Sequence, residues 1–203
     1  MLRYLALGDS YTIGEQVEPE QSFPHQTVRM LRADYGLTIQ QPEIIAQTGW
    51  TTDELIAAIP EKNLKDTFDF VSLLIGVNNQ YRNRSVENYE PEFKALLATA
   101  IQFSGGHPGK VFVLSIPDWG RTPFAADRDA QQIAAAIDAY NAANRKITKE
   151  LGCFYLDITE STKAHAALAP YLAEDGLHYS GKEYAVWAAQ LAPMIASAFP
   201  HNI

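Results

Sequence analysis

The chain has 203 residues, the length of one domain, and a chain of this size buries roughly 70% of its unfolded surface on folding. Hydrophobic residues make up 47% and charged residues 20%, which is typical of a globular protein and excludes long disordered segments. The formal net charge of −8 argues against a nucleic-acid partner and against purely electrostatic attachment to an anionic membrane. We therefore expect residues 1–203 to form one domain whose partner is a small molecule.

The single cysteine and the amino terminus bear on the compartment. Cys153 has no partner for an intramolecular disulfide, and it lies in the mostly apolar run 153–158, which predicts a core thiol rather than a nucleophile. Residues 1–6 are too few for the apolar region of a signal peptide, and no stretch approaches the roughly 18 apolar residues of a membrane span. These features predict a cytoplasmic protein, or a secreted one if a leader has been removed.

The first predicted strand is the apolar run 5–7, which ends in Gly8, Asp9 and Ser10. Ser10 then lies at the carboxyl end of a strand, where ligands bind in open parallel sheets. A serine in this place is a candidate nucleophile, although serine after glycine also serves as a helix cap or turn residue. The stretch alone does not decide between these roles.

A helix is predicted over residues 22–36, from its serine start, early proline and terminal glycine. A second strand is predicted over residues 43–47. Thr51 and Glu54 have the spacing of a capping box, so a helix should begin there. Gly49 would precede the positive end of that helix, where its N–H group can face an anion.

The middle of the chain repeats this alternation of strand and helix. Residues 68–76 are the clearest buried strand, and two amides, Asn78 and Asn79, follow it. A helix is predicted from about 86 to 103, and a fourth strand covers 110–116. Polar residues again follow where the apolar run stops.

The last third begins with an alanine-rich helix over residues 127–151, closed by a glycine, and a fifth strand over 153–158. A less regular segment follows and carries Asp175 and His178. Ser180 and Glu183 have capping-box spacing and predict the start of a final helix. Its apolar positions should face the core: Tyr184, Val186, Trp187, Leu191 and Ile195.

Strands that alternate with helices predict a parallel sheet covered by helices on both faces, which is a three-layer α/β/α sandwich. With five strands we expect the flavodoxin-like order 2-1-3-4-5. The switch point of that order lies between the strands that end near Ser10 and Asn78. Right-handed crossovers then bring all strand exits to one edge of the sheet.

Five residues at these exits form a catalytic constellation. Serine needs a base within hydrogen-bond reach, and the neutral imidazole of His178 can supply it near neutral pH. Asp175, three residues earlier, is close enough to accept the other ring N–H and to fix the tautomer. The Ser10 N–H, the Gly49 N–H and the Asn78 side-chain amide are candidate donors to an oxyanion, each worth about 3–4 kcal/mol in the transition state.

Four blocks of the sequence resemble the conserved blocks of the SGNH hydrolases, also called GDSL-type esterases and lipases. They are residues 8–11, Gly49, residues 76–79 and residues 175–178, in the family's order. The resemblance implies Ser10 as nucleophile, His178 as base, Asp175 as orienting acid, and Ser10, Gly49 and Asn78 as oxyanion donors. It also implies a flavodoxin-like fold and hydrolysis of acyl esters with no metal and no other cofactor.

One residue departs from the family pattern, because Asn79 stands where the third block usually has aspartate. This position is not expected to do chemistry, so the departure concerns local hydrogen bonding. The Gly-x-Ser-x-Gly elbow of α/β-hydrolases is absent, which argues against that fold.

Other interpretations of the same residues remain open. Each could be structural by itself, as a turn residue, a loop histidine or a helix-entry glycine. Asp9, Asp118, Asp175 and His178 could converge on a metal, although no close cluster of ligands is present in sequence. Residues 8–14 could cradle an anion in a non-catalytic flavodoxin-like module, which would leave Asp175 and His178 unexplained. His25, His107, His165 and His201 lack an acidic residue at useful spacing before them and are expected at the surface.

The sequence defines the substrate less closely than it defines the candidate catalytic residues. The aromatic residues near the strand exits could form walls for a sugar ring or short acyl chain: Tyr11, Trp50, Tyr81, Trp119 and Phe124. No long apolar insertion resembles a lipase lid. We therefore expect a short acyl group, such as acetyl, on a carbohydrate or small alcohol. Acyl transfer, thioester hydrolysis and lysophospholipid hydrolysis use the same machinery and stay open.

Overall fold

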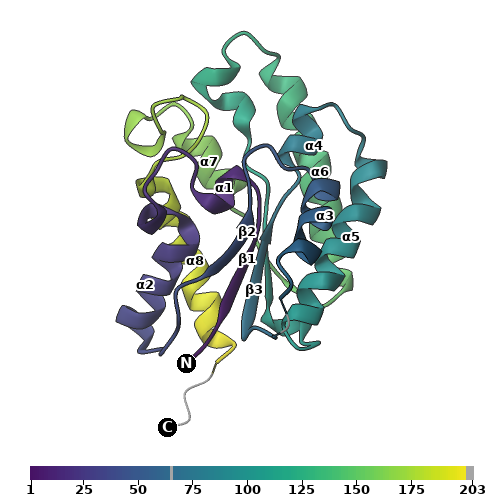
Figure 1. Ribbon diagram of the computed structural model, residues 1–203. Helices are drawn as coiled ribbons and strands as arrows, with labels where there is room; N and C mark the ends of the chain where they lie inside the picture. Colours follow the sequence, from purple (N-terminus) through teal and green to yellow (C-terminus); the bar gives the residue numbers. More distant parts are fainter. Residues whose placement is uncertain (65, 200–203) are drawn as a thin grey trace.

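The computed structural model describes residues 1–64 and 66–199, and its centre is a five-stranded parallel sheet (Figure 1). The strands are β1 (Tyr4–Gly8), β2 (Glu43–Ala46), β3 (Phe70–Leu74), β4 (Val111–Leu114) and β5 (Phe154–Leu156). They lie in the order β2-β1-β3-β4-β5, and every pair of neighbours is parallel. The predicted fold class and strand order are confirmed.

Helices cover both faces of the sheet. The α-helices are α1 (Ser10–Ile13), α2 (Phe23–Tyr35), α3 (Thr52–Glu61), α4 (Val77–Tyr81), α5 (Val86–Phe103), α6 (Ala130–Glu150), α7 (Thr159–His165) and α8 (Gly181–Ser197). The 3-10 helices are η1 (Pro19–Gln21), η2 (Pro108–Lys110), η3 (Trp119–Arg121), η4 (Pro123–Ala125) and η5 (Ala169–Tyr171). Figure 1 shows α2 and α8 side by side on one face and α3, α5 and α6 on the other.

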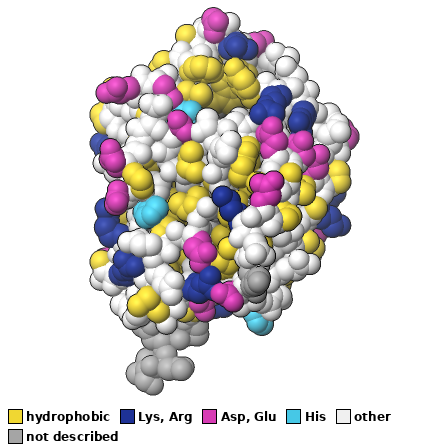
Figure 2. All heavy atoms as spheres, in the orientation of Figure 1, with side chains coloured by type: hydrophobic (Ala, Val, Ile, Leu, Met, Phe, Trp, Pro, Cys, Tyr) yellow, Lys and Arg dark blue, Asp and Glu magenta, His cyan; other side chains and the backbone are white. Residues whose placement is uncertain are grey.

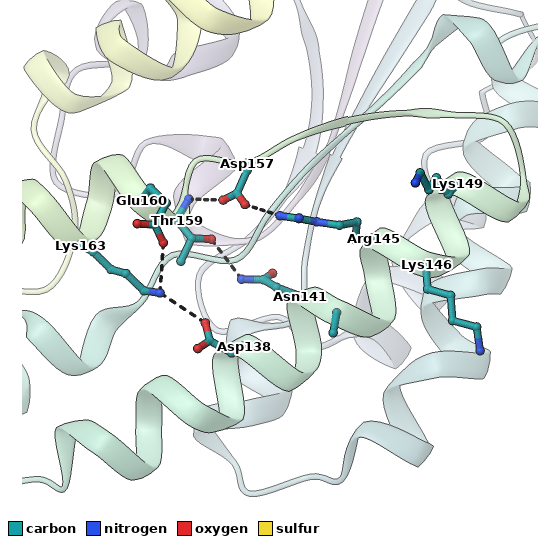
Figure 3. Close-up of a pocket in the computed structure, with 10 residues that line it drawn as sticks. Asp138, Asn141, Arg145, Lys146, Lys149, Asp157, Thr159, Glu160 and Lys163 are labelled. Carbon is teal, nitrogen blue, oxygen red and sulfur yellow. Dashed lines mark hydrogen bonds and ion pairs between the residues drawn. The ribbon is translucent and has the colours of Figure 1, made fainter.

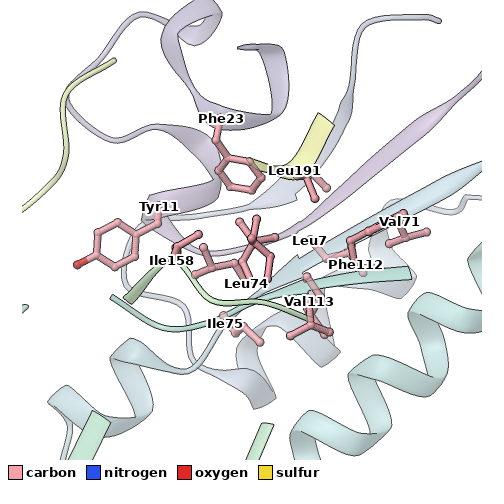
Figure 4. Close-up of a cluster of buried hydrophobic side chains, with 14 of the residues drawn as sticks. Leu7, Tyr11, Phe23, Val71, Leu74, Ile75, Phe112, Val113, Ile158 and Leu191 are labelled. Atoms are coloured by element: carbon pink, nitrogen blue, oxygen red, sulfur yellow. The ribbon is translucent and has the colours of Figure 1, made fainter. Parts of the chain in front are cut away.

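The core lies on both faces of the central strands. Every residue of β1 and of β3 is buried, which explains why these strands are almost continuously apolar in sequence. Leu7, Val71, Phe112 of β4 and Leu191 of α8 all belong to one buried hydrophobic cluster (Figure 4). The edge strands β2 and β5 are only partly buried. Burial is therefore deepest at the three central strands β1, β3 and β4, and the first two of these carry the exits predicted to hold Ser10 and Asn78.

The predicted helix starts differ in outcome. At α3 the capping box is present. The Thr51 side chain accepts from the Glu54 N–H, and the Glu54 carboxylate accepts from the Thr51 N–H at 2.8 Å. At α8 the predicted box is wrong. Ser180 does cap the helix through the Lys182 N–H, but its own N–H bonds to Tyr171 O. The Glu183 side chain turns into the core instead.

The carboxylate of Glu183 is fully buried and satisfied by three side chains. Ser161 Oγ donates at 2.6 Å and Trp187 Nε1 at 2.9 Å, and His165 Nδ1 lies 2.6 Å away. His165 also stacks on Tyr171, with ring centroids 3.9 Å apart. The prediction that His165 is a surface histidine is therefore wrong, because its acidic partner lies 18 residues later. This cluster ties α7 and α8 to the segment that precedes Asp175.

The remaining sequence predictions agree with the structure in outline. Cys153 is half-buried against the core, and burial raises the pKa of its thiol to about 11. Of the apolar positions predicted to face the core from α8, Val186 is only half-buried. His107 is exposed and His25 half-buried, whereas His201 lies outside the described residues. Among residues 1–64 and 66–199, no helix combines the length and the hydropathy needed to cross a membrane.

Candidate active site

A cavity of about 190 Å³ lies at the carboxyl ends of the strands. Segments that are far apart in sequence meet there: the β1 exit, the loop after β2, the β3 exit, the loop after β4 and the loop before α8. Its walls are Ser10, Tyr11, Thr48, Gly49, Val77, Asn78, Tyr81, Trp119, Phe124, Leu177 and His178. Four of the five predicted residues therefore surround this cavity: Ser10, Gly49, Asn78 and His178. The fifth, Asp175, is hydrogen-bonded to His178.

Ser10 is the first residue of α1, directly after β1. Asp9 caps this short helix, because its Oδ1 accepts from the Tyr11 N–H at 3.1 Å. Gly8 allows the close approach that the turn needs, since a Cβ there would lie 2.1 Å from Thr12 Oγ1 and 2.5 Å from Leu74 O. Ser10 is only 5% exposed, so the turn presents its side chain to the cavity rather than to bulk water.

The loop before α8 holds His178 against Asp175. The Asp175 Oδ2 atom lies 2.6 Å from His178 Nδ1, and Oδ1 accepts from the backbone N–H groups of Leu177 and His178, both at 2.9 Å. Partial burial alone would raise the pKa of Asp175, but these hydrogen bonds outweigh it and hold the pKa below its ordinary value. The carboxylate is ionised at neutral pH and can only accept, so the proton lies on Nδ1. Nε2 is then free to act as a base.

The described residues include no direct hydrogen bond between Ser10 Oγ and the His178 ring, although both line the cavity. Hydrogen bonds between a nucleophile and its base are often long before substrate binds. The Tyr11 ring packs against His178 at 5.6 Å between centroids and is itself buried. The imidazole is thus held at Nδ1 by Asp175 and packed against the ring of Tyr11.

The two residues predicted as further oxyanion donors, Gly49 and Asn78, also line the cavity. Gly49 has φ +82°, a conformation that favours glycine, and its carbonyl accepts from Arg82 Nη2 at 2.6 Å. The Asn78 amide donates one N–H to Trp50 O at 3.0 Å, which fixes the side chain and leaves a second N–H unused by that bond. The arrangement has the composition of an oxyanion hole, with the Ser10 N–H as its third member.

Asn79, the departure from the family pattern, is fully buried and bonded to Thr52. Its Oδ1 accepts from the Thr52 N–H at 3.0 Å, and its Nδ2 donates to Thr52 Oγ1 at 2.6 Å. Thr52 Oγ1 in turn donates to the Glu92 carboxylate. An amide suits this chain of bonds because the carboxylate at its end is already supplied by Glu92. Asn79 therefore joins α4 to α3 and does not line the cavity.

Two of the aspartates considered as metal ligands together with Asp175 and His178 do not line the cavity. Asp9 and Asp118 are buried, and neither lines the cavity. Asp118 Oδ1 accepts from the Gly120 N–H at 3.0 Å and caps η3. Burial raises the pKa of Asp9 to about 7, and its Oδ2 has no hydrogen-bond partner among the described residues. Within residues 1–64 and 66–199, no three His, Cys, Asp or Glu side chains are grouped closely enough to hold a metal ion.

A larger hollow of about 520 Å³ lies between α6 and α7 and holds none of the predicted residues (Figure 3). Its charges are largely paired within the hollow. Arg145 is bonded to Asp157, and Lys163 lies 3.3 Å from both Asp138 and Glu160. Volume alone therefore does not identify the functional site, and the smaller cavity carries the candidate nucleophile and base.

A sequence profile of the GDSL-like lipase/acylhydrolase family matches residues 6–186, most of the chain. The chain belongs to this family. The resemblance seen in four short blocks thus extends from β1 into the start of α8. No curated protein sequence matches the chain significantly.

Solved structures share the fold at low sequence identity. An acetylxylan esterase from Geobacillus stearothermophilus is 19% identical, with a TM-score of 0.73 over 96% of this chain and 94% of that one. A lipase/acylhydrolase from Enterococcus faecalis is 22% identical, with a TM-score of 0.67 over 97% and 96% of the two chains. A GDSL-like lipase from Parabacteroides merdae is 18% identical, with a TM-score of 0.74 over 95% and 96%.

The aromatic walls differ in part from those expected. Tyr11, Tyr81, Trp119 and Phe124 line the cavity, whereas Trp50 contributes its carbonyl to Asn78 and not its ring to the wall. Trp119 is 4% exposed, while the rings of Tyr81 and Phe124 are 44% and 42% exposed at the rim. Figure 2 shows hydrophobic side chains gathered near the top of the face, the end at which the strands finish in Figure 1.

Sequence reasoning missed three wall residues: Thr48, Val77 and Leu177. Each is a neighbour in sequence of a residue that was predicted, so proximity to Gly49, Asn78 and His178 was the available signal. The side chains of Val77 and Leu177 make the cavity more apolar than the polar constellation alone suggested.

Proposed function

We propose that this protein is a serine esterase that hydrolyses acyl esters through an acyl-enzyme formed on Ser10. The observation that carries the proposal is the 2.6 Å contact between Asp175 and His178 Nδ1, with the His178 ring and Ser10 on the walls of one cavity. This contact leaves Nε2 of His178 free to act as the base in the proposed mechanism. Membership of the GDSL-like lipase/acylhydrolase family supports the same chemistry.

The reaction proceeds in two halves. Ser10 Oγ attacks the acyl carbon as His178 Nε2 takes its proton, and the carbonyl oxygen becomes an oxyanion that accepts from Ser10, Gly49 and Asn78. The bond to the alcohol breaks, and the alcohol leaves with the proton from His178. Water then attacks the acyl-enzyme, giving its proton to His178. The carboxylic acid departs and the proton returns to Ser10.

The size and lining of the cavity favour a short acyl group. About 190 Å³ is below the range of sites that enclose drug-sized ligands, and the walls are mainly apolar and aromatic. The buried Trp119 closes the cavity on one side. An acetyl group or one slightly longer fits these dimensions, and a long fatty chain does not.

A panel of 4-nitrophenyl esters from acetate to palmitate tests the proposal. We expect the highest kcat/KM for acetate or butyrate, and a loss of at least about 10³-fold in Ser10→Ala. Activity that rises steadily toward palmitate would contradict the short acyl group. Equal activity in wild type and Ser10→Ala would contradict the esterase mechanism and favour a non-catalytic module.

A further inference from the structure

A second hollow, of about 310 Å³, lies beside the candidate active site and shares two of its aromatic lining residues, Tyr81 and Trp119. It is bounded by α4, η3 and the first half of α6. Tyr81 and Trp119 line both hollows, with ring centroids 5.3 Å apart and planes at 66°. Gln80 Oε1 accepts from Trp119 Nε1 at 2.7 Å and fixes this ring. The two rings therefore belong to the lining of both hollows, which lie next to each other.

The rest of the second hollow is polar and carries charges of both signs. Arg84, Arg128 and Asp129 line it together with the amides of Asn83 and Gln132. Asn83 and Arg84 lie between α4 and α5, Arg128 and Asp129 lie between η4 and α6, and Gln132 lies in the first turn of α6. Together these groups offer both hydrogen-bond donors and hydrogen-bond acceptors.

Several of these groups are already oriented by the fold. The Arg84 guanidinium bonds to Asp53 at 2.5 Å, which takes up much of its charge. Asp129 Oδ1 accepts from the N–H groups of Gln131 and Gln132, both at 3.0 Å, and so fixes the first turn of α6. The exposed Gln132 side chain projects from this fixed turn. The hollow is therefore preorganised at its α6 side.

The lining selects a ligand with many hydroxyl groups. An acyl chain in this hollow would cover the exposed Arg128, Asp129 and Gln132 side chains and remove water from their polar groups, which is unfavourable. A sugar satisfies amides, a carboxylate and a guanidinium through its hydroxyl groups, and it presents C–H faces to aromatic rings. The smaller, more apolar hollow beside Ser10 lacks these groups.

We propose that the second hollow binds the sugar part of an acylated sugar, while the acyl group occupies the cavity at Ser10. This inference rests on the proposed esterase function and extends it to the alcohol side of the substrate. Tyr81 and Trp119 contact both parts of the ester, and Gln132 and Arg128 bind the sugar hydroxyl groups.

The test compares two substrates with the same acyl group. Monoacetylated trisaccharides of glucose and of xylose place a sugar in the second hollow, whereas 4-nitrophenyl acetate does not. We expect Gln132→Ala and Arg128→Ala to lower the ratio of kcat/KM for the better trisaccharide to that for 4-nitrophenyl acetate by about tenfold, through KM. Gln131→Ala changes the same residue type one position away and is outside the hollow. It should keep the wild-type ratio.

Binding measured without turnover gives an independent readout. Calorimetric titration of Ser10→Ala with the free trisaccharides should show binding that weakens about tenfold when Gln132→Ala is added. An unchanged ratio and unchanged binding in both variants would overturn the subsite. A wild-type protein inactive on 4-nitrophenyl acetate but able to bind the trisaccharide would instead overturn the esterase function alone.

Discussion

Replacing Asp175 by asparagine isolates one contact of the candidate catalytic centre. The Asp175 Oδ1 atom accepts from the N–H groups of Leu177 and His178, and an asparagine oxygen keeps both bonds. The Oδ2 atom faces His178 Nδ1 at 2.6 Å, and the asparagine NH₂ group cannot accept there. The substitution therefore preserves the turn but favours the imidazole tautomer with its proton on Nε2. That tautomer cannot take the proton of Ser10.

The expected loss is large for activity and small for stability. In a triad of this design, asparagine at the acid position lowers kcat by about 10⁴-fold, or about 5 kcal/mol of transition-state stabilisation. Asp175→Ala removes the same contact and also strips the acceptor from two backbone N–H groups. It should therefore also lower the free energy of unfolding by about 1–3 kcal/mol.

The assay is kcat on 4-nitrophenyl acetate at pH 8, with urea unfolding of each variant. Glu174→Gln serves as the matched control, since Glu174 is the exposed neighbouring carboxylate and should change neither quantity. A kcat for Asp175→Asn within tenfold of wild type, in a protein of wild-type stability, would refute the role of Asp175 in orienting the base.

Three further predictions concern buried polar groups. Glu183→Ala leaves the Trp187 indole N–H and two other donors unpaired and should cost about 3–5 kcal/mol of unfolding free energy. Burial raises the pKa of Asp9 to about 7, so the folded state holds a proton that the unfolded state releases near pH 4. Stability should fall by up to about 4 kcal/mol as pH rises from 4 to 7, and Asp9→Asn should remove this dependence. Asn79→Asp places a second carboxylate beside the Thr52–Glu92 bond and should cost about 1–3 kcal/mol, which Glu92→Gln should recover.

Urea unfolding measures all three. Glu160→Ala, which breaks only an exposed ion pair with Lys163, should cost no more than about 1 kcal/mol beside Glu183→Ala. Parallel pH profiles for wild type and Asp9→Asn would contradict the protonation of Asp9. Additive effects of Asn79→Asp and Glu92→Gln would show that the two side chains do not share the Thr52 hydroxyl.

Much of the fold and the placement of the candidate site could be predicted from local patterns. Parallel strands bring their exits to one edge, so Ser10 after β1 and Asn78 after β3 had to lie near each other. The three-residue spacing from Asp175 to His178 allows one turn to join carboxylate and imidazole, and that contact is present. These inferences needed only strand direction and chain reach.

The predictions that were wrong depend on tertiary contacts. Glu183 has the spacing of a capping box, but Ser161 and Trp187 offer stronger partners inside the core. The same carboxylate contacts His165, which is half-buried, although the two are far apart in sequence. Trp50 lies next to Gly49, yet proximity in sequence did not show whether its ring or its carbonyl would serve the site.

The central claim is that the Ser10 hydroxyl is a nucleophile activated by His178. The most direct measurement is the mass of the protein after treatment with a fluorophosphonate, followed by mapping of the modified peptide. We expect one adduct per chain, located on Ser10 and lost in His178→Ala. An unmodified Ser10 in a folded, wild-type protein would contradict the account.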